Sequence, residues 1–524
     1  FFAAFFSTPS LQAVDVVGTT PLPGLGQPLD EIASPVQTLN AAQLEVSPGQ
    51  SLADVMNQNL GSVHINDNQG NPFAADVSYR GFTASPLLGT PQGLSVYVDG
   101  VRMNQPFGDV VNWDVIPRGA IQSLTLIPGS NPLFGLNTLG GAISIQTKDG
   151  LSAPGTRLEV SGGAHNRGLA EFQSGGSNAQ GFNWYVLGSR FTDKSWRDAS
   201  TSAVNQLFSK LGWKQAGTDV QLTLAATDAQ LLGGGLQQSE LLSADARSVF
   251  TKPDMVNNRS QLVNLALRHA LNDQTLFSGN LYWRQTQTHT VNGDINEESF
   301  NQDIYNVGEP GVTALNQRYS STGFFPSARC LEEAGTNEEP NEKCNALYNT
   351  SSTTQSNAGL SGQFTFLQPL AQGMNNLVVG AALDRSTTRF SQQSQFGYLN
   401  PDRSLATVNA FANGTQASED AFDQRVELSA SSRTVSAFAS NTLSQGHWHW
   451  SASARMNSTF LDNNDHLLPS VGQTTQAVQG VSVARKSLTE SHSYHRINPS
   501  LGLSFTPSAA FKPYASYSES SRAP

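Results

Sequence analysis

A period-two alternation of apolar and polar residues begins at Arg157 and recurs along the rest of the chain. Its clearest run is HWHWSASARMN, residues 447–457, in which even positions carry Trp, Ala or Met and odd positions carry His, Ser, Arg or Asn. Successive side chains of a β-strand point to opposite faces of the sheet. One face of each predicted strand therefore suits lipid and the other suits a polar interior, which is typical of an antiparallel transmembrane β-barrel.

The connections between these predicted strands alternate strictly between short and long. Residues 215–217 and 444–446 are short connections, whereas residues 229–259 and 286–356 form long polar ones. Outer-membrane barrels have short periplasmic turns and long extracellular loops, while a soluble sandwich has no reason to keep this asymmetry. The pattern predicts about thirteen strands, fewer than the roughly 22 of plugged transporters. We therefore expect the sequence to be a fragment, with its remaining strands beyond Pro524.

Composition excludes several other classes of protein. The net charge of −11 argues against a basic surface for nucleic acid. No apolar run approaches the roughly 20 residues that a membrane-spanning helix needs. No Ser-His-Asp order, paired-carboxylate motif or HExxH stands out, so we expect no catalytic residues and no enzyme.

Before the alternating region, ordered motifs indicate a small mixed domain. A short strand ends at Arg80-Gly81, and Asp99-Gly100 is a strong hairpin signal because a type I′ turn needs positive φ at both central residues. A strand over residues 121–127 follows, and Gly140-Gly141 opens a last strand. Upstream, Ser51 with Asp54 three positions later is typical of a capped helix start.

In this order the motifs resemble the plug domain of TonB-dependent outer-membrane receptors, over roughly residues 30–150. The resemblance implies a mainly β protein, with a small mixed α/β plug domain followed by an antiparallel transmembrane β-barrel. We expect residues 1–13 to be the remnant of a signal peptide and residues 14–29 to be flexible. The plug then takes residues 30–150, and the partial barrel takes residues 156–524.

An extended, β-prone run precedes the expected plug. It consists of Val14, Asp15, Val16, Val17, Gly18 and Thr19. In the resembled family a segment at this place is the TonB box, which adds a strand to the periplasmic protein TonB. The alternative is a plain linker between signal peptide and plug.

The resemblance also gives structural roles to plug residues. They are Arg80, Gly81, Asp99, Gly100, Gly140 and Gly141. Arg80 is expected to tie the plug to a carboxylate of the barrel wall. Glu159, Glu171 and Glu427 are possible partners, and no spacing argument selects one of them.

Two plug loops, residues 83–92 and 105–113, are candidates for meeting a ligand from outside. Their apolar residues supply possible contact surface. The residues concerned are Pro86, Leu87, Phe107 and Trp113. The same side chains could equally pack inside the barrel.

Cysteines and histidines raise the question of covalent or metal sites. Cys330 and Cys344 lie close together in an acidic loop, which indicates a local disulfide in an oxidising compartment, with two free thiols as the alternative. His447 and His449 project to one side of a strand and could share a metal or haem iron. Alternation equally predicts ordinary polar residues there, so we expect neither a metal nor a cofactor.

The function implied by the resemblance is TonB-dependent active uptake of a scarce bulky solute across the outer membrane of a Gram-negative bacterium. Ferric siderophores, haem and cobalamin are the implied cargo, and the expected partners are TonB with its inner-membrane energising complex, outer-membrane lipid and the small ligand. An alternative is a plugged-barrel surface adhesin without energy coupling. A secreted all-β carbohydrate-active enzyme is a further alternative. Nothing in the loop sequences selects a ligand.

Overall fold

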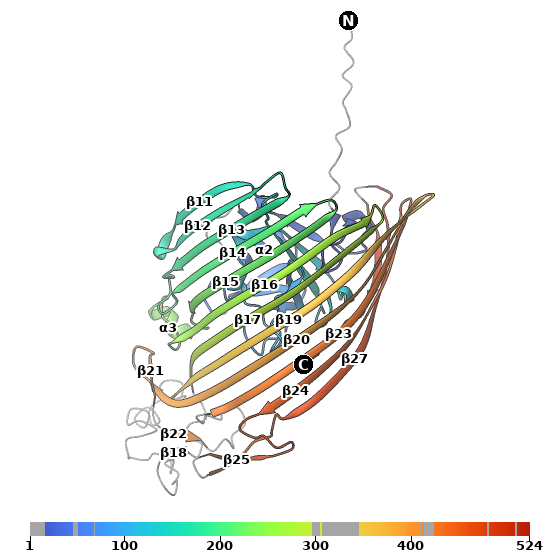
Figure 1. Ribbon diagram of the computed structural model, residues 1–524. Coiled ribbons are helices and arrows are strands. Elements are labelled where there is room, and N and C mark those ends of the chain that lie inside the picture. The colour runs from blue at the N-terminus through green and yellow to red at the C-terminus, as the bar shows by residue number, and fades with distance from the viewer. Residues whose placement is uncertain are drawn as a thin grey trace.

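The computed structural model describes residues 16–45, 51–67, 69–295, 304–306, 345–407, 410–412, 424–478, 481–508 and 511–523. Long antiparallel strands form a curved wall, and a small mixed α/β domain lies on its concave side (Figure 1). We call the large sheet the wall and the small domain the plug. The predicted fold class and the predicted order of the two domains are confirmed.

The wall is a 14-stranded sheet in which β21 (Leu405–Thr407) pairs with β20 and the remaining thirteen strands follow in chain order. These are β11 (Gly155–Gly162), β12 (Gly168–Ser177), β13 (Phe182–Asp193), β14 (Ser202–Gln215), β15 (Thr218–Leu232), β16 (Asp254–Asn272), β17 (Thr275–Ile295), β19 (Asn345–Leu370), β20 (Gly373–Leu399), β23 (Gln424–Gln445), β24 (Trp448–Asp465), β27 (Glu490–Phe505) and β28 (Tyr514–Ser518). Every neighbouring pair along this path is antiparallel. The predicted number of strands is confirmed.

The two edges of the wall differ in the length of their connections. At one edge, tight turns join β14 to β15, β16 to β17, β19 to β20 and β23 to β24. In the first of these turns Ala216 and Gly217 take φ values of 50° and 77°, as a two-residue turn between twisted strands requires. At the other edge, residues 233–253 and their helix α3 (Ser239–Ala244) connect β15 to β16. We call these edges the turn edge and the loop edge.

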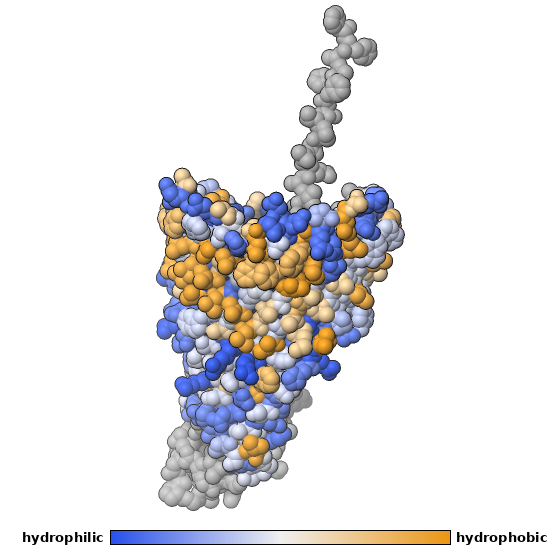
Figure 2. Space-filling model, turned by 45° about the vertical axis from the view of Figure 1, so that its right-hand side comes forward, coloured by the Kyte–Doolittle hydropathy of each residue, from blue (hydrophilic) through white to orange (hydrophobic). Residues whose placement is uncertain are grey.

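Outward-facing side chains of the wall form an apolar belt near the turn edge. Trp448 and Met456 are 43% and 50% exposed, whereas Asn457, on the opposite face of the same strand, is 2% exposed. Leu207 and Leu265 belong to the same outward face. Figure 2 shows this belt as an orange band, with hydrophilic residues on its loop side. The alternation of residues 447–457 therefore has the orientation that was predicted.

The plug contains two small sheets. Its five-stranded sheet has the order β3 (Gln37–Asn40), β9 (Ile121–Pro128), β10 (Gly141–Thr147), β7 (Leu94–Val98) and β8 (Val101–Arg102), and its three-stranded sheet consists of β4 (Val63–Asn66), β5 (Asp76–Tyr79) and β6 (Phe82–Ala84). Strands β10 and β7 are parallel and the other pairs are antiparallel. Asp99 and Gly100 join β7 to β8 with φ values of 46° and 82°, which confirms the predicted hairpin.

The helices of the plug are short. They are α1 (Ala41–Glu45) and α2 (Leu52–Asn59), with 3₁₀ turns η1 (Leu29–Glu31), η2 (Trp113–Val115), η3 (Arg118–Ala120) and η4 (Pro132–Phe134). Helix α2 begins with the predicted capping box, because Ser51 and Asp54 satisfy each other's backbone N–H groups. Leu52, Val55 and Met56 bury its apolar face in the plug core. No helix within the described ranges has the length and apolarity to span a membrane.

The remaining elements are short pairs outside the two main sheets. They are β1 (Val16–Val17) with β2 (Gln27–Pro28), β18 (Ile304–Asn306) with β22 (Ala410–Ala412), β25 (Thr475–Val478) with β26 (Val481–Ala484), and the turn η5 (Ala164–Asn166). The first pair lies just before the plug. It includes part of the expected TonB box.

We expect a charge in the apolar belt to destabilise the wall. Leu265 on β16 is 43% exposed and lies between Leu222 and Leu281. Leu265→Arg should lower the free energy of unfolding by roughly 2–4 kcal/mol, because the guanidinium would face lipid. Urea unfolding in lipid vesicles measures the change. Gln230→Arg, on the same outward face of β15 as Leu222 but eight residues closer to the loop edge and opposite Ala203 and Asn257, is the control and should leave stability nearly unchanged. Equal losses in the two variants would contradict this assignment of the belt.

Candidate ligand site and plug–wall interface

A cavity of about 650 Å³ lies between the plug loops and the loop-edge ends of the wall strands. We call it the outer cavity. Its plug side includes Pro86, Leu87, Leu88 and Phe107, and its wall side includes Met255, Thr288, Ser351, Gln355 and Phe390. The Phe107 ring packs on that of Phe390 at 4.8 Å between centroids, and the Phe107 backbone N–H donates to Gln355 Oε1 at 2.9 Å. Plug and wall therefore build this cavity jointly.

The lining of the outer cavity combines apolar surface with amide and hydroxyl groups. Its charged side chains are the carboxylates of Asp114 and Asp254, and no Lys or Arg occurs among its described lining residues. Asn292 Nδ2 donates a hydrogen bond to the Asp254 carboxylate at 2.7 Å. Such a surface can bind a ligand through apolar contacts and hydrogen bonds. No Lys or Arg among the described lining residues is present to bind an anionic ligand.

Asp114 connects this cavity to the plug–wall interface. Its side chain is fully buried, and Asn258 Nδ2 on β16 donates to both carboxylate oxygens at 3.1 and 3.2 Å. The Asp114 carbonyl accepts from Gln206 Nε2 on β14 at 2.6 Å. Burial raises the pKa of Asp114 to about 6, against the opposing effect of the Asn258 hydrogen bond.

Of the four ligand-contact candidates from the sequence, three reach the outer cavity. Pro86, Leu87 and Phe107 line it. The side chain of Trp113 is only 2% exposed and lies in the plug core, so it does not line the cavity. The alternation of the wall carries no information about plug loops, and apolar composition does not separate a cavity-lining residue from a core residue.

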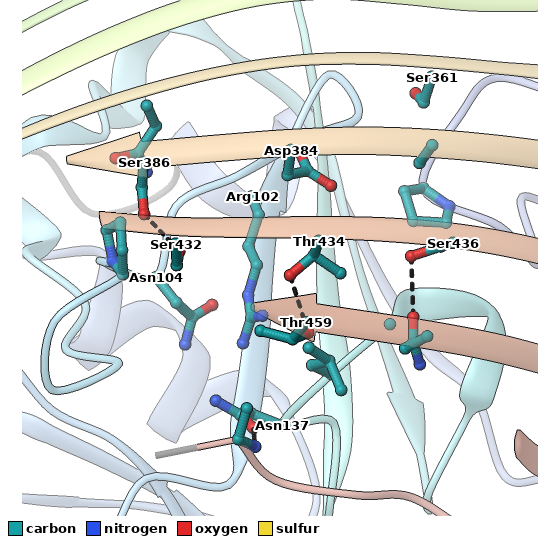
Figure 3. A pocket seen from close by; sticks show the side chains of 18 of the residues that line it. Arg102, Asn104, Asn137, Ser361, Asp384, Ser386, Ser432, Thr434, Ser436 and Thr459 are labelled. Atoms are coloured by element: carbon teal, nitrogen blue, oxygen red, sulfur yellow. Dashed lines mark hydrogen bonds between the residues drawn. The ribbon is translucent and has the colours of Figure 1, made fainter. Parts of the chain in front are cut away.

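A second cavity, of about 200 Å³, lies deeper between plug and wall. We call it the inner cavity. Arg102 enters it from the plug and forms an ion pair with Asp109 at 2.9 Å (Figure 3). Its wall side carries hydroxyl and amide groups that bond across neighbouring strands: Ser386 with Ser432, Thr434 with Thr459, and Ser436 with Asn457. Gln105 lines both cavities, so the inner cavity adjoins the outer one.

The Asp99 carboxylate joins plug to wall. It accepts from the Thr147 backbone N–H at 2.9 Å and the Thr147 hydroxyl at 2.5 Å, within the plug. Lys210 Nζ of β14 forms an ion pair with it at 2.9 Å, and Asn264 of β16 donates to the Asp99 carbonyl at 3.1 Å. The hairpin turn identified in the sequence is therefore also an attachment point to the wall.

Two buried wall arginines bind backbone carbonyls of the plug. Arg284 donates to the carbonyls of Met103 and Asn104 at 2.6 and 3.0 Å, and Arg455 donates to that of Leu133 at 3.1 Å. Arg284, Arg455 and Lys210 were not predicted from the sequence as interface residues. A usable signal was present, because each is a cation at an inward position of a strand whose adjacent residues face lipid.

The structure does not bear out the expected role of Arg80. Its side chain is exposed, with φ of 50°, and its guanidinium lies over the Tyr79 ring at 5.1 Å. Among described residues no ion pair joins Arg80 to Glu159, Glu171 or Glu427, and Glu159 instead pairs with Arg157 at 2.8 Å. The plug arginine whose charge faces Glu171 and Glu159 is Arg118. Sequence order could not show which plug arginine the fold brings to these carboxylates.

The structure shows why glycine occupies three positions of the predicted plug motifs. Gly81 has φ of 86°, and a Cβ at Gly140 would collide with the Phe82 ring. A Cβ at Gly141 would lie 2.8 Å from the Ile127 carbonyl oxygen. These positions therefore require glycine for turn geometry or for close packing.

The expected TonB box is described only in part. Val14 and Asp15 lie outside the described residues, while Val16 and Val17 form β1 and pair with Pro28 and Gln27. Val17 is 6% exposed. Gly18 and Thr19 follow β1 as the chain turns back toward β2.

Cys330 and Cys344 lie outside the described residues. His449 is buried against Ser444, with 3.0 Å between Nδ1 and Oγ, whereas the exposed His447 ring contacts the Thr506 carbonyl. Within the described ranges no group of three potential metal ligands is found.

We expect Lys210→Met to weaken the plug–wall interface strongly. The side chains of Asp99 and Lys210 are 11% and 3% exposed, so the variant would leave a buried carboxylate without its cation. Removing one partner of such a pair costs roughly 3–5 kcal/mol. Urea unfolding in detergent, with proteolysis of the plug as a second readout, measures the loss. Asp99→Asn combined with Lys210→Met should recover part of it, and no recovery would contradict the pairing.

Asp114→Asn should stabilise the protein in a pH-dependent way. The raised pKa means that the folded state binds the proton more tightly than the unfolded state, so wild-type stability falls as pH rises from about 4 to above 6. The variant lacks this slope, so its advantage should grow over that range to ~3 kcal/mol and then remain constant. Thermal unfolding in detergent between pH 4 and 8 measures it. A difference independent of pH would contradict a buried, titrating carboxyl.

Comparison with known proteins places both domains. The family model of the TonB-dependent receptor plug domain matches residues 28–142, and the model of the TonB-dependent receptor-like β-barrel matches residues 195–524. A rhizobactin receptor of Rhizobium meliloti (strain 1021) is 30% identical over 158 residues, which are 30% of this chain and 20% of that receptor.

Solved structures share the fold at low sequence identity. The unliganded ferric citrate transporter FecA has a TM-score of 0.66 and 14% identity, over 94% of this chain and 63% of FecA. The siderophore receptor PiuA from Acinetobacter baumannii has a TM-score of 0.65 and 12% identity, over 94% of this chain and 65% of PiuA. The ferric-catecholate receptor Fiu from E. coli K12, in its open form, has a TM-score of 0.65 and 13% identity, over 95% of this chain and 71% of Fiu. The chain thus spans under two thirds of the length of FecA and PiuA.

Proposed function

This chain belongs to the TonB-dependent receptor family, and from that premise we propose that it serves TonB-dependent active uptake of a bulky solute across the outer membrane of a Gram-negative bacterium. The loop edge of the wall then faces outside and the turn edge faces the periplasm. The observation that carries this proposal is the outer cavity of about 650 Å³, which plug loops and loop-edge strands build together. A ligand in it touches both domains at once.

The proposed cargo is a ferric chelate. The relatives are described as receptors or transporters of rhizobactin, ferric citrate and other siderophores. The described lining of the outer cavity offers Phe and Leu side chains, amides, hydroxyls and two carboxylates. This chemistry favours a chelate that presents apolar and hydrogen-bonding groups on a neutral surface rather than a polyanion, because no described cation would compensate the ligand's charge.

The proposed coupling path runs through the segment before the plug. Beyond β1, Pro21 and Leu22 line the inner cavity, and Leu22 is 3% exposed. Pro21 packs closely on Gly100, since a Cβ added to Gly100 would lie 3.2 Å from the Pro21 carbonyl oxygen. Gly100 belongs to the hairpin turn that Lys210 attaches to the wall. A pull on Val14 to Thr19 would therefore first displace the residues that close the inner cavity.

The contacts that hold this segment to the wall are polar. Gln27 donates to the Thr442 hydroxyl at 2.6 Å, and the Ser444 hydroxyl donates to Glu31 at 3.0 Å, both close to the turn edge. The Gln27 bond contributes about 1 kcal/mol net and the bond to the Glu31 carboxylate about 2 kcal/mol, and water can replace both once the segment moves. Ligand binding at the outer cavity and TonB binding at β1 would then bias the same plug between two arrangements.

We expect Val16→Pro to abolish uptake and to leave ligand binding intact. Proline removes the backbone N–H that strand addition to TonB needs, and the outer cavity lies at the other edge of the wall. The two steps are measured as uptake and surface binding in cells that express the native full-length receptor. Iron-55 labelled siderophores, iron-55 labelled haem and cobalt-57 labelled cobalamin are each offered separately.

Val16→Thr is the matched control, since threonine keeps both the N–H and the β-branched side chain. Uptake by the control together with loss in Val16→Pro supports strand addition at this segment. Normal uptake by Val16→Pro would place the coupling segment elsewhere. Binding without uptake in the wild type would favour the adhesin alternative.

A further inference from the structure

The outward face of the β20–β23 pair changes from apolar to basic between two successive outward residue pairs. Going from the turn edge, its outward pairs are Val379 with Ala439, Ala381 with Ala437, and Leu383 with Val435. The next outward pair is Arg385 with Arg433. Leu383 and Val435 are 45% and 47% exposed and belong to the apolar belt. The two arginines therefore lie on the loop side of the belt, level with outer-leaflet headgroups.

A third arginine extends this surface. Arg389 lies two outward positions beyond Arg385 on β20, opposite Ser429, and is exposed like the other two. Four residues of strand correspond to roughly 13 Å. We call Arg385, Arg389 and Arg433 the arginine cluster.

The cluster has no acidic partner in the described part of the chain. None of its members forms an ion pair there, and Arg433 only lies over the Phe460 ring at 5.1 Å. Asp462 and Glu427 face outward nearby, but each lies further toward the loop edge, and Asp462 accepts from the Ser491 hydroxyl at 2.7 Å. Like charges directly opposite on adjacent strands are unfavourable unless something compensates them.

Elsewhere on the outward face of the wall, arginines on the loop side of the belt are compensated by protein. Arg259 pairs with Asp228 at 3.1 Å, and Arg190 donates to Asn205 Oδ1 at 3.1 Å. Both follow the apolar belt on outward faces of their strands. On the β20–β23 pair, in contrast, the residue opposite Arg385 is another arginine and not an acceptor such as Asp228 or Asn205.

We propose that the arginine cluster binds the phosphate of an outer-leaflet lipid headgroup whose acyl chains lie on the apolar pairs below it. Guanidinium groups bind phosphate oxygens in a bidentate manner, so one phosphate between Arg385 and Arg433 compensates both charges. The apolar surface of Leu383 and Val435 directly below selects a lipid over free phosphate. Basic surfaces beside membrane-spanning segments recognise anionic lipids by this combination.

The test compares Arg385→Gln/Arg433→Gln with Arg190→Gln/Arg259→Gln, which removes the same number of exposed charges from other outward positions of the wall. Each full chain is placed in nanodiscs of phosphatidylcholine doped with a phosphorylated glycolipid or with its dephosphorylated form. Native mass spectrometry counts the glycolipid bound, and heat-modified electrophoresis confirms that each variant is folded. Inorganic phosphate is added as a competitor in a separate arm.

We expect the cluster variant to bind the phosphorylated lipid about tenfold more weakly, as the loss of charged hydrogen bonds predicts. The Arg190/Arg259 variant should bind like wild type, and the dephosphorylated lipid should bind weakly to all three. Equal binding by both variants, or equal retention of the two lipid forms, would overturn the proposal. Displacement by inorganic phosphate at the affinity of the lipid would overturn the choice of lipid as the ligand. This result does not depend on transport activity.

Discussion

The ion pair between Asp99 and Lys210 is the interaction on which the arrangement of the two domains depends. It lies at the hairpin turn of the plug, is nearly excluded from water, and joins a plug strand to an inward face of the wall. Arg284 and Arg455 extend the same principle, since they donate to plug carbonyls rather than to wall carboxylates. These inward-facing wall side chains thus find their hydrogen-bond acceptors on the plug. Without the plug, the buried guanidinium groups would lose acceptors, and the plug carbonyls would lose donors.

This interface explains how a folded plug can both close a pore and be moved. A plug held by an apolar core would have to expose that core to leave its place, whereas hydrogen bonds to the wall can be exchanged for water. The apolar core of the plug is internal to it and runs through Met56, Val96 and Ile143. Across the interface the hydrogen bonds and ion pairs are joined only by small apolar contacts, such as Phe107 on Phe390 and Leu133 with Val378 and Phe438. The plug therefore connects the outer cavity to the segment that carries β1, which suits signalling from a ligand at one end to TonB at the other.

Sequence alone predicted the features that repeat or that act locally. Alternation determined the orientation of Trp448 and Asn457, because burial of a strand face depends only on parity. The Asp99-Gly100 turn and the cap at Ser51 were readable because their hydrogen bonds close within a few residues. Lys210, Asp114 and Arg118 were not, because their partners come from the other domain. For Trp113 the sequence left both ligand contact and internal packing open, and the side chain lies in the plug core. Such contacts depend on how the plug sits in the wall, which no local pattern encodes.

The most direct test of the account measures accumulation of a labelled ferric siderophore by cells that rely on the native full-length receptor, before and after the proton gradient is collapsed. Surface binding should persist and accumulation should stop, because the plug moves only when TonB is energised. Accumulation that continues without the gradient would contradict it, since the plug would then be passable without a pull on the segment before it.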